Sequence, residues 1–156
     1  MANRYFIGEY TKPLDEKNRL RIPDSMQRVI EVQQGENRGL YIVLGEQPGS
    51  LSLYTEPVFD ELVTRVKTDT LESPEAIDFE LNFFPQAHHV TGDAQWRFVL
   101  PEQLRKRAGL KDQVVLAGRG RRIDVFEPEA YASATAGRKE GWPNWSRFLR
   151  MESRNK

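Results

Sequence analysis

The chain contains 156 residues without a cysteine, and its 23 Lys and Arg balance its 23 Asp and Glu. This length suits one domain or two very small ones, and the 38% of hydrophobic residues can form a core without metal or disulfide support. The absence of cysteine excludes disulfides, thiolate nucleophiles and cysteine zinc sites. No stretch reaches the roughly 18 uninterrupted apolar residues that a membrane span needs, and the N-terminus lacks the apolar core of a signal peptide. We therefore expect a cytoplasmic protein with no membrane partner.

The neutral total hides an uneven distribution of charge. Residues 1–78 hold 9 Lys and Arg against 14 Asp and Glu, whereas residues 79–156 hold 14 against 9. The neutral total argues against a uniformly basic nucleic-acid-binding protein, but the basic surplus of the second half is compatible with a local group of cations.

One sequence pattern occurs twice, at a spacing of 78 residues. Leu14–Pro23 (LDEKNRLRIP) and Gly92–Pro101 (GDAQWRFVLP) both contain Asp-x-x-x-Arg and end with an aliphatic residue and proline. Farther along, four residues of the first half match four of the second, namely Leu51, Leu53, Tyr54 and Phe59 with Ile123, Val125, Phe126 and Tyr131. A repeat of this kind indicates one supersecondary unit built twice.

Each copy predicts the same elements in the same order. RLRIP and RFVLP alternate polar and apolar residues, as half-buried strands do. Pro23 and Pro101 are expected at the first helical position, N1, and Gly109 is expected to cap the second of these helices. Two strands joined by a turn follow each helix, at residues 39–44 and 51–54 and again at 113–118 and 122–126. Helices beginning near Pro57 and Pro128 close the two halves.

The segments outside the two copies differ from each other in character. Residues 72–84 predict a bridging helix with Ser73 as its N-cap, and one face of this helix carries Ile77, Leu81 and Phe84. The tail, residues 137–156, is basic and is interrupted by a proline. It is either disordered or docks on a neighbouring molecule through Trp142, Trp145, Phe148 and Leu149.

The repeated motif, Asp15 with Arg19 and Asp93 with Arg97, has a physical use in a bend. An Asp at a bend accepts backbone amide protons and holds the turn, while an Arg four residues later begins the outgoing strand. An arginine held in this way matches the geometry of a phosphate and loses little side-chain entropy on binding. The alternative is that each Asp only pairs with its Arg across the turn.

With these motifs in this order, the sequence resembles the MraZ family over about residues 5–132. The resemblance rests on Leu-Asp-x-Lys-x-Arg-Leu-x-Ile-Pro, on the second Asp-x-x-x-Arg, and on Leu-Pro-x-x-Leu-Arg-x-x-Ala-Gly-Leu after it. It implies an α+β, β-rich fold of two tandem AbrB-like swapped-hairpin units, residues 5–71 and 85–136. These units would interleave as a pseudo-two-fold β-barrel with flanking helices.

The same resemblance implies a sequence-specific DNA-binding transcriptional regulator, expected to be a repressor of the division and cell-wall gene cluster. Such a protein forms a ring-shaped homo-oligomer on the nucleoid and binds double-stranded DNA with tandem short repeats in its own promoter. The resemblance implies that two arginines face the DNA, Arg19 and Arg97. Two carboxylates support them, Asp15 and Asp93, and two further cations add contacts, Lys17 and Arg21. No catalysis, cofactor, metal or small-molecule substrate is expected.

The residue before each motif arginine departs from the family pattern, which commonly has glycine there. Asn18 tolerates a left-handed backbone, so we expect the first bend to be intact. Trp96 does not tolerate it easily, which predicts that the second bend follows another path or no longer presents Arg97 in the family manner. We expect the indole to fill a gap between subunits rather than to wedge against DNA. The first copy is therefore expected to be the one that contacts DNA.

Three further cations are candidates for phosphate contacts, namely Lys12, Arg119 and Arg121. The last two belong to the turn Gly118–Arg122, which either clamps a phosphate or is a solvated turn whose charges serve solubility or subunit pairing. This turn is not a P-loop, because no Gly-Lys-Ser/Thr follows. The adjacent His88 and His89 point to opposite faces of a strand, so we expect no metal site there.

Two other functions are compatible with the sequence. A ring-forming scaffold for protein interactions, with weakened or lost DNA binding, would fit the low net charge, Trp96 and the aromatic tail. An antitoxin-like partner would require an adjacent toxin gene and two separate chains, and the internal repeat counts against it.

Overall fold

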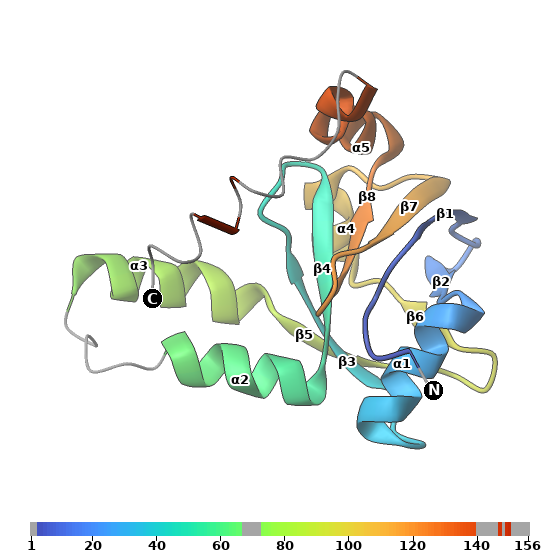
Figure 1. Ribbon diagram of the computed structural model, residues 1–156, viewed down its shortest axis with the longest axis horizontal. Coiled ribbons are helices and arrows are strands. Elements are labelled where there is room, and N and C mark those ends of the chain that lie inside the picture. Colours follow the sequence, from blue (N-terminus) through green and yellow to red (C-terminus); the bar gives the residue numbers. More distant parts are fainter. Residues whose placement is uncertain (1–2, 67–72, 140–146, 148, 151–156) are drawn as a thin grey trace.

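The computed structural model describes residues 3–66, 73–139, 147 and 149–150, and in it the chain has the expected α+β fold (Figure 1). The elements are β1 (Glu9–Pro13), β2 (Arg19–Arg21), α1 (Asp24–Gln34), β3 (Gly39–Leu44), β4 (Ser50–Thr55), α2 (Glu56–Val66), α3 (Pro74–Phe83), β5 (His88–Thr91), β6 (Arg97–Val99), α4 (Glu102–Ala108), β7 (Gln113–Gly118), β8 (Ile123–Phe126) and α5 (Pro128–Ala134). Short 3-10 helices follow α3 at Phe84–Gln86 and α5 at Ala136–Lys139. Among the described residues, no helix combines the length and apolar character needed to cross a membrane. Trp142, Trp145 and Phe148, on which the expectation for the tail depends, lie outside the described residues.

The elements repeat in one order, which is strand, strand, helix, strand, strand, helix. β1, β2, α1, β3, β4 and α2 form the first set, and β5, β6, α4, β7, β8 and α5 form the second, with α3 between them. The predicted hairpins and closing helices are therefore confirmed. The internal sequence repeat is a repeat of structure.

The two halves exchange strands. β1 of the first half pairs antiparallel with β7 of the second, and β5 of the second half pairs with β3 of the first. β4 and β8 pair at the centre, which gives one six-stranded sheet in the order β1-β7-β8-β4-β3-β5. The expected interleaving is therefore confirmed. β2 and β6 pair separately, so in the described part of the chain the barrel consists of a sheet and a two-stranded ribbon.

A local two-fold axis relates the halves. Leu20 lies opposite Phe98 in the β2–β6 ribbon, and Ser52 lies opposite Asp124 between β4 and β8. In each pair the two residues are also equivalent in the sequence repeat, at spacings of 78 and 72 residues. A residue that faces its own equivalent lies on the symmetry axis, so the axis passes through both pairs.

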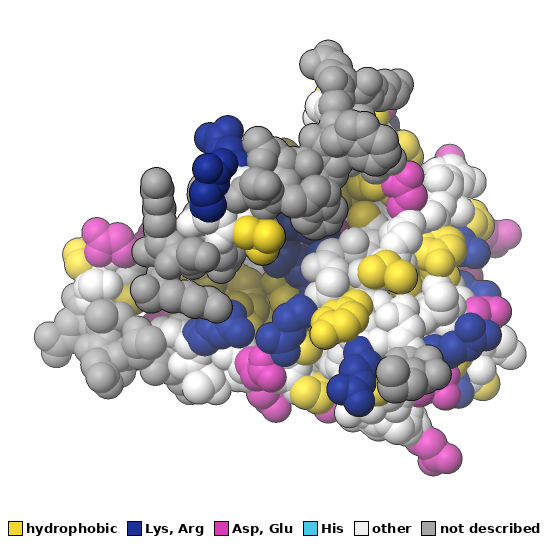
Figure 2. Space-filling view, viewed as in Figure 1, with side chains coloured by type: hydrophobic (Ala, Val, Ile, Leu, Met, Phe, Trp, Pro, Cys, Tyr) yellow, Lys and Arg dark blue, Asp and Glu magenta, His cyan; other side chains and the backbone are white. Residues whose placement is uncertain are grey.

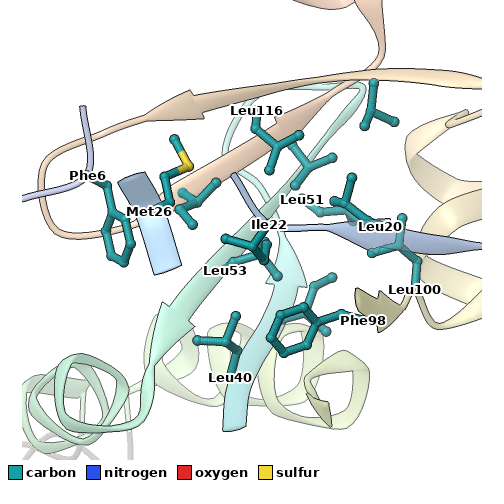
Figure 3. Packing of buried hydrophobic residues seen from close by; sticks show 14 of the residues in the cluster. Phe6, Leu20, Ile22, Met26, Leu40, Leu51, Leu53, Phe98, Leu100 and Leu116 are labelled. Carbon is teal, nitrogen blue, oxygen red and sulfur yellow. The ribbon is translucent and has the colours of Figure 1, made fainter. Parts of the chain in front are cut away.

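Apolar side chains from both halves form one core around this axis (Figure 3). Leu20 and Phe98 point inward from the ribbon and are 0% and 2% exposed. Leu51 and Leu116 belong to the same cluster and come from the six-stranded sheet. Burial of each such large side chain stabilises the fold by about 1.5–3 kcal/mol. The ribbon is therefore attached to the sheet through its inward side chains.

Helices α1 and α4 begin one residue later than the sequence predicts. Pro23 and Pro101 are the N-caps rather than N1 residues, with ψ angles of 147° and 130°. The proline ring fixes φ but leaves ψ free to take the extended value of a cap residue. The Pro23 carbonyl still accepts the amide protons of Met26 and Gln27. The predicted C-cap is confirmed, because Gly109 is left-handed with φ 68°.

Helix α3 has the predicted cap but does not bury the predicted face. The Ser73 side chain caps the helix, as expected. Ile77 and Leu81, however, are 44% and 68% exposed. The helix packs instead through Phe83, which stacks on Phe59 of α2. α2 and α3 lie side by side at the left of Figure 1, on the side of the molecule away from the β2–β6 ribbon.

A buried carboxylate lies on the two-fold axis. Asp124 is 2% exposed and accepts hydrogen bonds from Ser52 Oγ at 2.7 Å, Arg119 Nη1 at 2.7 Å and Arg122 Nε at 3.1 Å. A buried carboxylate is strongly unfavourable unless it is paired and hydrogen-bonded. Two arginines of the Gly118–Arg122 turn therefore serve to neutralise this group.

We expect Asp124→Ala to lower the free energy of unfolding by about 3 kcal/mol, because Ser52 and two arginines lose their buried acceptor. Urea denaturation of parent and variant measures the difference. The matched control is Arg121→Ala, which removes an exposed ion pair with Glu61 from the same turn and should cost no more than about 1 kcal/mol. Equal losses in the two variants would contradict a special structural role for the axis carboxylate.

Candidate nucleic-acid interface

The first bend, residues 15–19, is held by the Asp15 carboxylate. Its Oδ1 accepts the amide protons of Lys17 and Arg19, both at 2.9 Å, and its Oδ2 accepts the Arg19 Nε proton at 2.6 Å. Asn18 is left-handed, with φ 58°, as expected for this bend. Within the described part of the chain, the terminal amino groups of Arg19 have no acceptor, and its side chain is 27% exposed. The guanidinium is thus fixed at one edge and presents the other to solvent.

The second bend, residues 93–97, has the same geometry. Asp93 Oδ1 accepts the amide protons of Gln95 and Arg97, both at 2.9 Å, and Oδ2 accepts the Arg97 Nε proton at 2.8 Å. Trp96 is left-handed with φ 60°, like its counterpart Asn18. The expectation that Trp96 diverts this bend is therefore wrong. Arg97 is presented as Arg19 is, except that its Nη2 also donates to the Gln95 side chain at 3.0 Å.

Contacts from the other half hold Trp96 in this unfavourable backbone conformation. The indole is 7% exposed and belongs to the main core. The Arg38 guanidinium lies over the ring, 4.7 Å from its centroid, and donates a hydrogen bond to the Asp93 carbonyl. A left-handed backbone costs a non-glycine residue about 1–2 kcal/mol, whereas deleting a buried aromatic side chain typically costs about 3–5 kcal/mol. The stabilisation from burying the indole therefore exceeds the cost of the left-handed backbone. The indole fills the chain's own core rather than a gap between subunits.

Both motif carboxylates have a lowered pKa. The amide proton of Arg19 is the main cause that lowers the pKa of Asp15, partial desolvation opposes it, and the Arg19 side chain and the Lys17 amide add to the lowering. The Arg97 amide, the Arg97 side chain and the Gln95 amide lower the pKa of Asp93 in the same way, again against desolvation. Each Asp does pair with its Arg across the turn. That pairing uses one edge of the arginine, so it fixes the side chain and leaves donors for a ligand.

The β2–β6 ribbon brings both motif arginines onto one outward face. Leu20 and Phe98 point into the core, and because side chains alternate along a strand, the outward residues are Arg19, Arg21, Arg97 and Val99. In the register, Arg19 faces Val99 and Arg21 faces Arg97. Like charges directly opposite one another destabilise a sheet. Such an unfavourable placement is typical of a functional surface.

A depression of about 360 Å³ brings together predicted residues of both copies, although Lys17 and Asp93 are not among its lining residues. It is lined by Lys12, Pro13, Asp15, Arg19, Arg21 and Arg97. Arg21 also pairs with Asp24 at 2.9 Å, but both side chains are about half exposed or more, so the pair contributes little. The four cations that line the depression outnumber the three carboxylates that pair with them, which are Asp15, Asp24 and Asp93. Its electrostatic field therefore favours an anion.

The remaining candidates lie elsewhere. Arg119 binds Asp124 at 2.7 Å and Arg121 binds Glu61 at 2.6 Å, so both engage carboxylates of their own chain, and neither lines the depression. His89 Nε2 bonds to Glu56 Oε2 at 2.8 Å. In the described ranges, no group of three or more His, Asp or Glu side chains could hold a metal ion. On the face shown in Figure 2, basic and acidic side chains are interspersed, in keeping with the neutral total charge.

Two features of the site were missed by sequence reasoning. Arg38 precedes Asp93 by 55 residues, and nothing in its local sequence marks it as the partner of the second bend. The ribbon register, which sets Arg21 against Arg97, also joins strands far apart in the chain. The repeat itself was the available signal for the register, because two copies of a short strand in one domain can pair about a two-fold axis.

The fold and the site define a class of protein, in which two tandem units exchange strands and each supplies an Asp-x-x-x-Arg bend to one cationic face. A family model described as "MraZ protein, putative antitoxin-like" matches residues 83–141. The transcriptional regulator MraZ of Parvibaculum lavamentivorans is 31% identical over 93% of this chain and 89% of its own length. That of Ruegeria pomeroyi is 30% identical over 91% and 88%, and that of Thermomicrobium roseum is 29% identical over 82% and 85%. The chain belongs to the MraZ family.

We expect Trp96→Gly to lower the free energy of unfolding by about 2 kcal/mol, because the lost indole contacts outweigh the relief of the left-handed backbone. Arg38→Ala should cost about 1 kcal/mol in the parent and less in the Trp96→Gly background, where its ring partner is gone. A double-mutant cycle in urea measures this coupling. The matched control is Asn18→Gly, which should change stability by less than about 1 kcal/mol. Additive effects of Arg38 and Trp96 would contradict the contact.

Stability should also depend on pH through the two motif carboxylates. Their folded pKa values lie below the unfolded value of about 3.9. The unfolded state therefore binds more protons in acid. The stability that the two carboxylates contribute is fully present above about pH 4 and is lost as pH falls through their folded pKa values. The double variant Asp15→Asn, Asp93→Asn should lose less stability than the parent between about pH 5 and about pH 2. Thermal melts followed by circular dichroism test this, and parallel pH profiles would refute it.

Proposed function

We propose that this chain is a DNA-binding transcriptional regulator and that the outward face of the β2–β6 ribbon contacts the DNA. The observation that carries the proposal is that Arg19, Arg21 and Arg97, from two separate motifs, meet on one exposed face. The relatives in Thermomicrobium roseum and Parvibaculum lavamentivorans are named transcriptional regulators, which supports the same role. The role requires neither catalysis nor a cofactor.

The dimensions of the ribbon suit the major groove. That groove of B-DNA is about 12 Å wide and admits a two-stranded β-ribbon, whose strands lie about 4.8 Å apart. An arginine held at its Nε edge can direct its remaining donors to guanine O6 and N7 or to a phosphate. In this arrangement Lys12 and Lys17 contact phosphates at the rim, and Asp15 and Asp93 hold the arginines without touching DNA.

A neutral chain gains affinity for DNA by presenting the same face several times. Linked weak contacts bind far more tightly than one contact, provided that the geometry allows them to engage together. We therefore propose a ring-shaped homo-oligomer in which each subunit consists of units 5–71 and 85–136. Its target is a set of tandem short repeats upstream of its own gene in the division and cell-wall cluster, where it acts as a repressor on the nucleoid in the cytoplasm.

The exposed apolar side chains of α3 favour a second candidate function. Ile77, Phe79 and Leu81 are 44%, 40% and 68% exposed, on the side of the molecule away from the ribbon (Figure 1). Such side chains suit contacts with protein, as a scaffold would require. Salt titration separates the two functions. An affinity for upstream DNA that falls steeply with salt supports the regulator. No measurable affinity for that DNA at low salt would instead favour the scaffold function.

We expect Arg19→Ala to weaken binding to the upstream DNA by about tenfold or more, because one good arginine contact to a base is worth about 1–3 kcal/mol. Fluorescence anisotropy measures the affinity, and size-exclusion chromatography should give the same assembly for parent and variant. If the variant binds the upstream DNA as tightly as the parent, the assignment of Arg19 is wrong.

Lys17→Ala and Arg65→Ala provide the comparison for that result. Loss of Lys17 should weaken binding to all sequences alike and reduce the salt slope by about one. Arg65 is an exposed cation on α2, which lies away from the ribbon (Figure 1). Its loss should leave both the affinity for DNA and the salt slope unchanged.

A further inference from the structure

The outward face of the ribbon departs from two-fold symmetry at one pair of positions. Arg19 and Arg97 are equivalent in the repeat, but the equivalent of Arg21 is Val99. The register sets Arg21 opposite Arg97 and Val99 opposite Arg19. One end of the face therefore carries two arginines, whereas the other carries an arginine beside an aliphatic side chain.

Val99 is an exposed aliphatic residue between two buried ones. Its side chain is 56% exposed, whereas Phe98 and Leu100 on either side are each 2% exposed. A single exposed valine needs no explanation on an ordinary surface. Val99, however, lies at one end of the face that the proposed function places against DNA, directly opposite Arg19, so a ligand bound there would cover it.

We propose that Val99 is a specificity-determining residue that contacts the C5-methyl group of a thymine. This inference rests on the proposed DNA-binding function. In the major groove, guanine presents acceptors that suit arginine, and thymine presents a methyl group that suits an apolar side chain. The end with Arg21 and Arg97 then favours guanine and the end with Val99 favours thymine. The preferred sequence is not self-complementary, and each subunit has one direction on the DNA.

The test uses the full chain and begins with selection from a random-sequence library of double-stranded DNA. Anisotropy titrations of the selected duplex then compare each thymine with deoxyuridine, which lacks only the methyl group. At one position the parent should lose about fourfold in affinity, the factor for one buried methyl-sized group. Val99→Ala should bind the thymine duplex more weakly and should lose little further affinity at that deoxyuridine.

Two further variants sharpen the result. Val32 is a second exposed valine, 46% exposed on α1, and Val32→Ala should keep the fourfold sensitivity to deoxyuridine. Val99→Arg gives both ends of the face two arginines, so the sequence that it selects should become self-complementary at its centre, with guanine in place of the contacted thymine.

The outcomes separate this inference from the function on which it rests. Selection that enriches no sequence overturns the proposed function and the role of Val99 with it. A clear sequence preference with the same deoxyuridine sensitivity in the parent and in Val99→Ala overturns the role of Val99 alone. Loss of that sensitivity in Val99→Ala, with Val32→Ala unchanged, supports the inference.

Discussion

The pairing of β2 with β6 is the constraint on which the rest of the structure depends. Each strand has only three residues, and a two-stranded ribbon of this size is unstable alone. It exists because Leu20 and Phe98 are buried in the common core and because Asp15 and Asp93 turn the chain into it. The exchange of β1 and β5 between the halves holds the bends at the same place. One pairing therefore joins the sequence repeat, the core and the cationic face.

The molecule concentrates positive charge locally instead of carrying a net charge. Partly exposed ion pairs such as Asp15 with Arg19 contribute little to stability. Their effect is to restrict the arginine to one orientation, which lowers the entropy that a bound anion would have to overcome. At the buried carboxylate of Asp124 the arginines have the opposite role. Arg119 and Arg122 neutralise Asp124 and so stabilise the fold. The same residue type thus serves recognition in the ribbon and stability at the axis.

Local patterns allowed the elements, the caps at Ser73 and Gly109 and the first Asp-x-x-x-Arg bend to be predicted from the sequence, and the family resemblance supplied the interleaving. The path of the second bend could not be predicted, because the preference of Trp96 is overridden by burial and by Arg38 from the other half. The exposure of Ile77 and Leu81 likewise depends on which face of α3 meets α2. The joining of both motifs in one depression depends on the ribbon register, which no local pattern encodes.

Ser52 and Asp124 occupy one position of the repeat and touch each other across the axis. In a dimer of two identical short chains that position would face itself, and any change would occur twice, so an aspartate there would meet a second buried aspartate. Joined in one polypeptide, the halves can mutate separately. A serine then meets an aspartate, a tryptophan replaces an asparagine, and a valine replaces an arginine, while the backbone keeps its symmetry. Covalent fusion has given this molecule the chemical freedom of a heterodimer at the fixed stoichiometry of a single gene product.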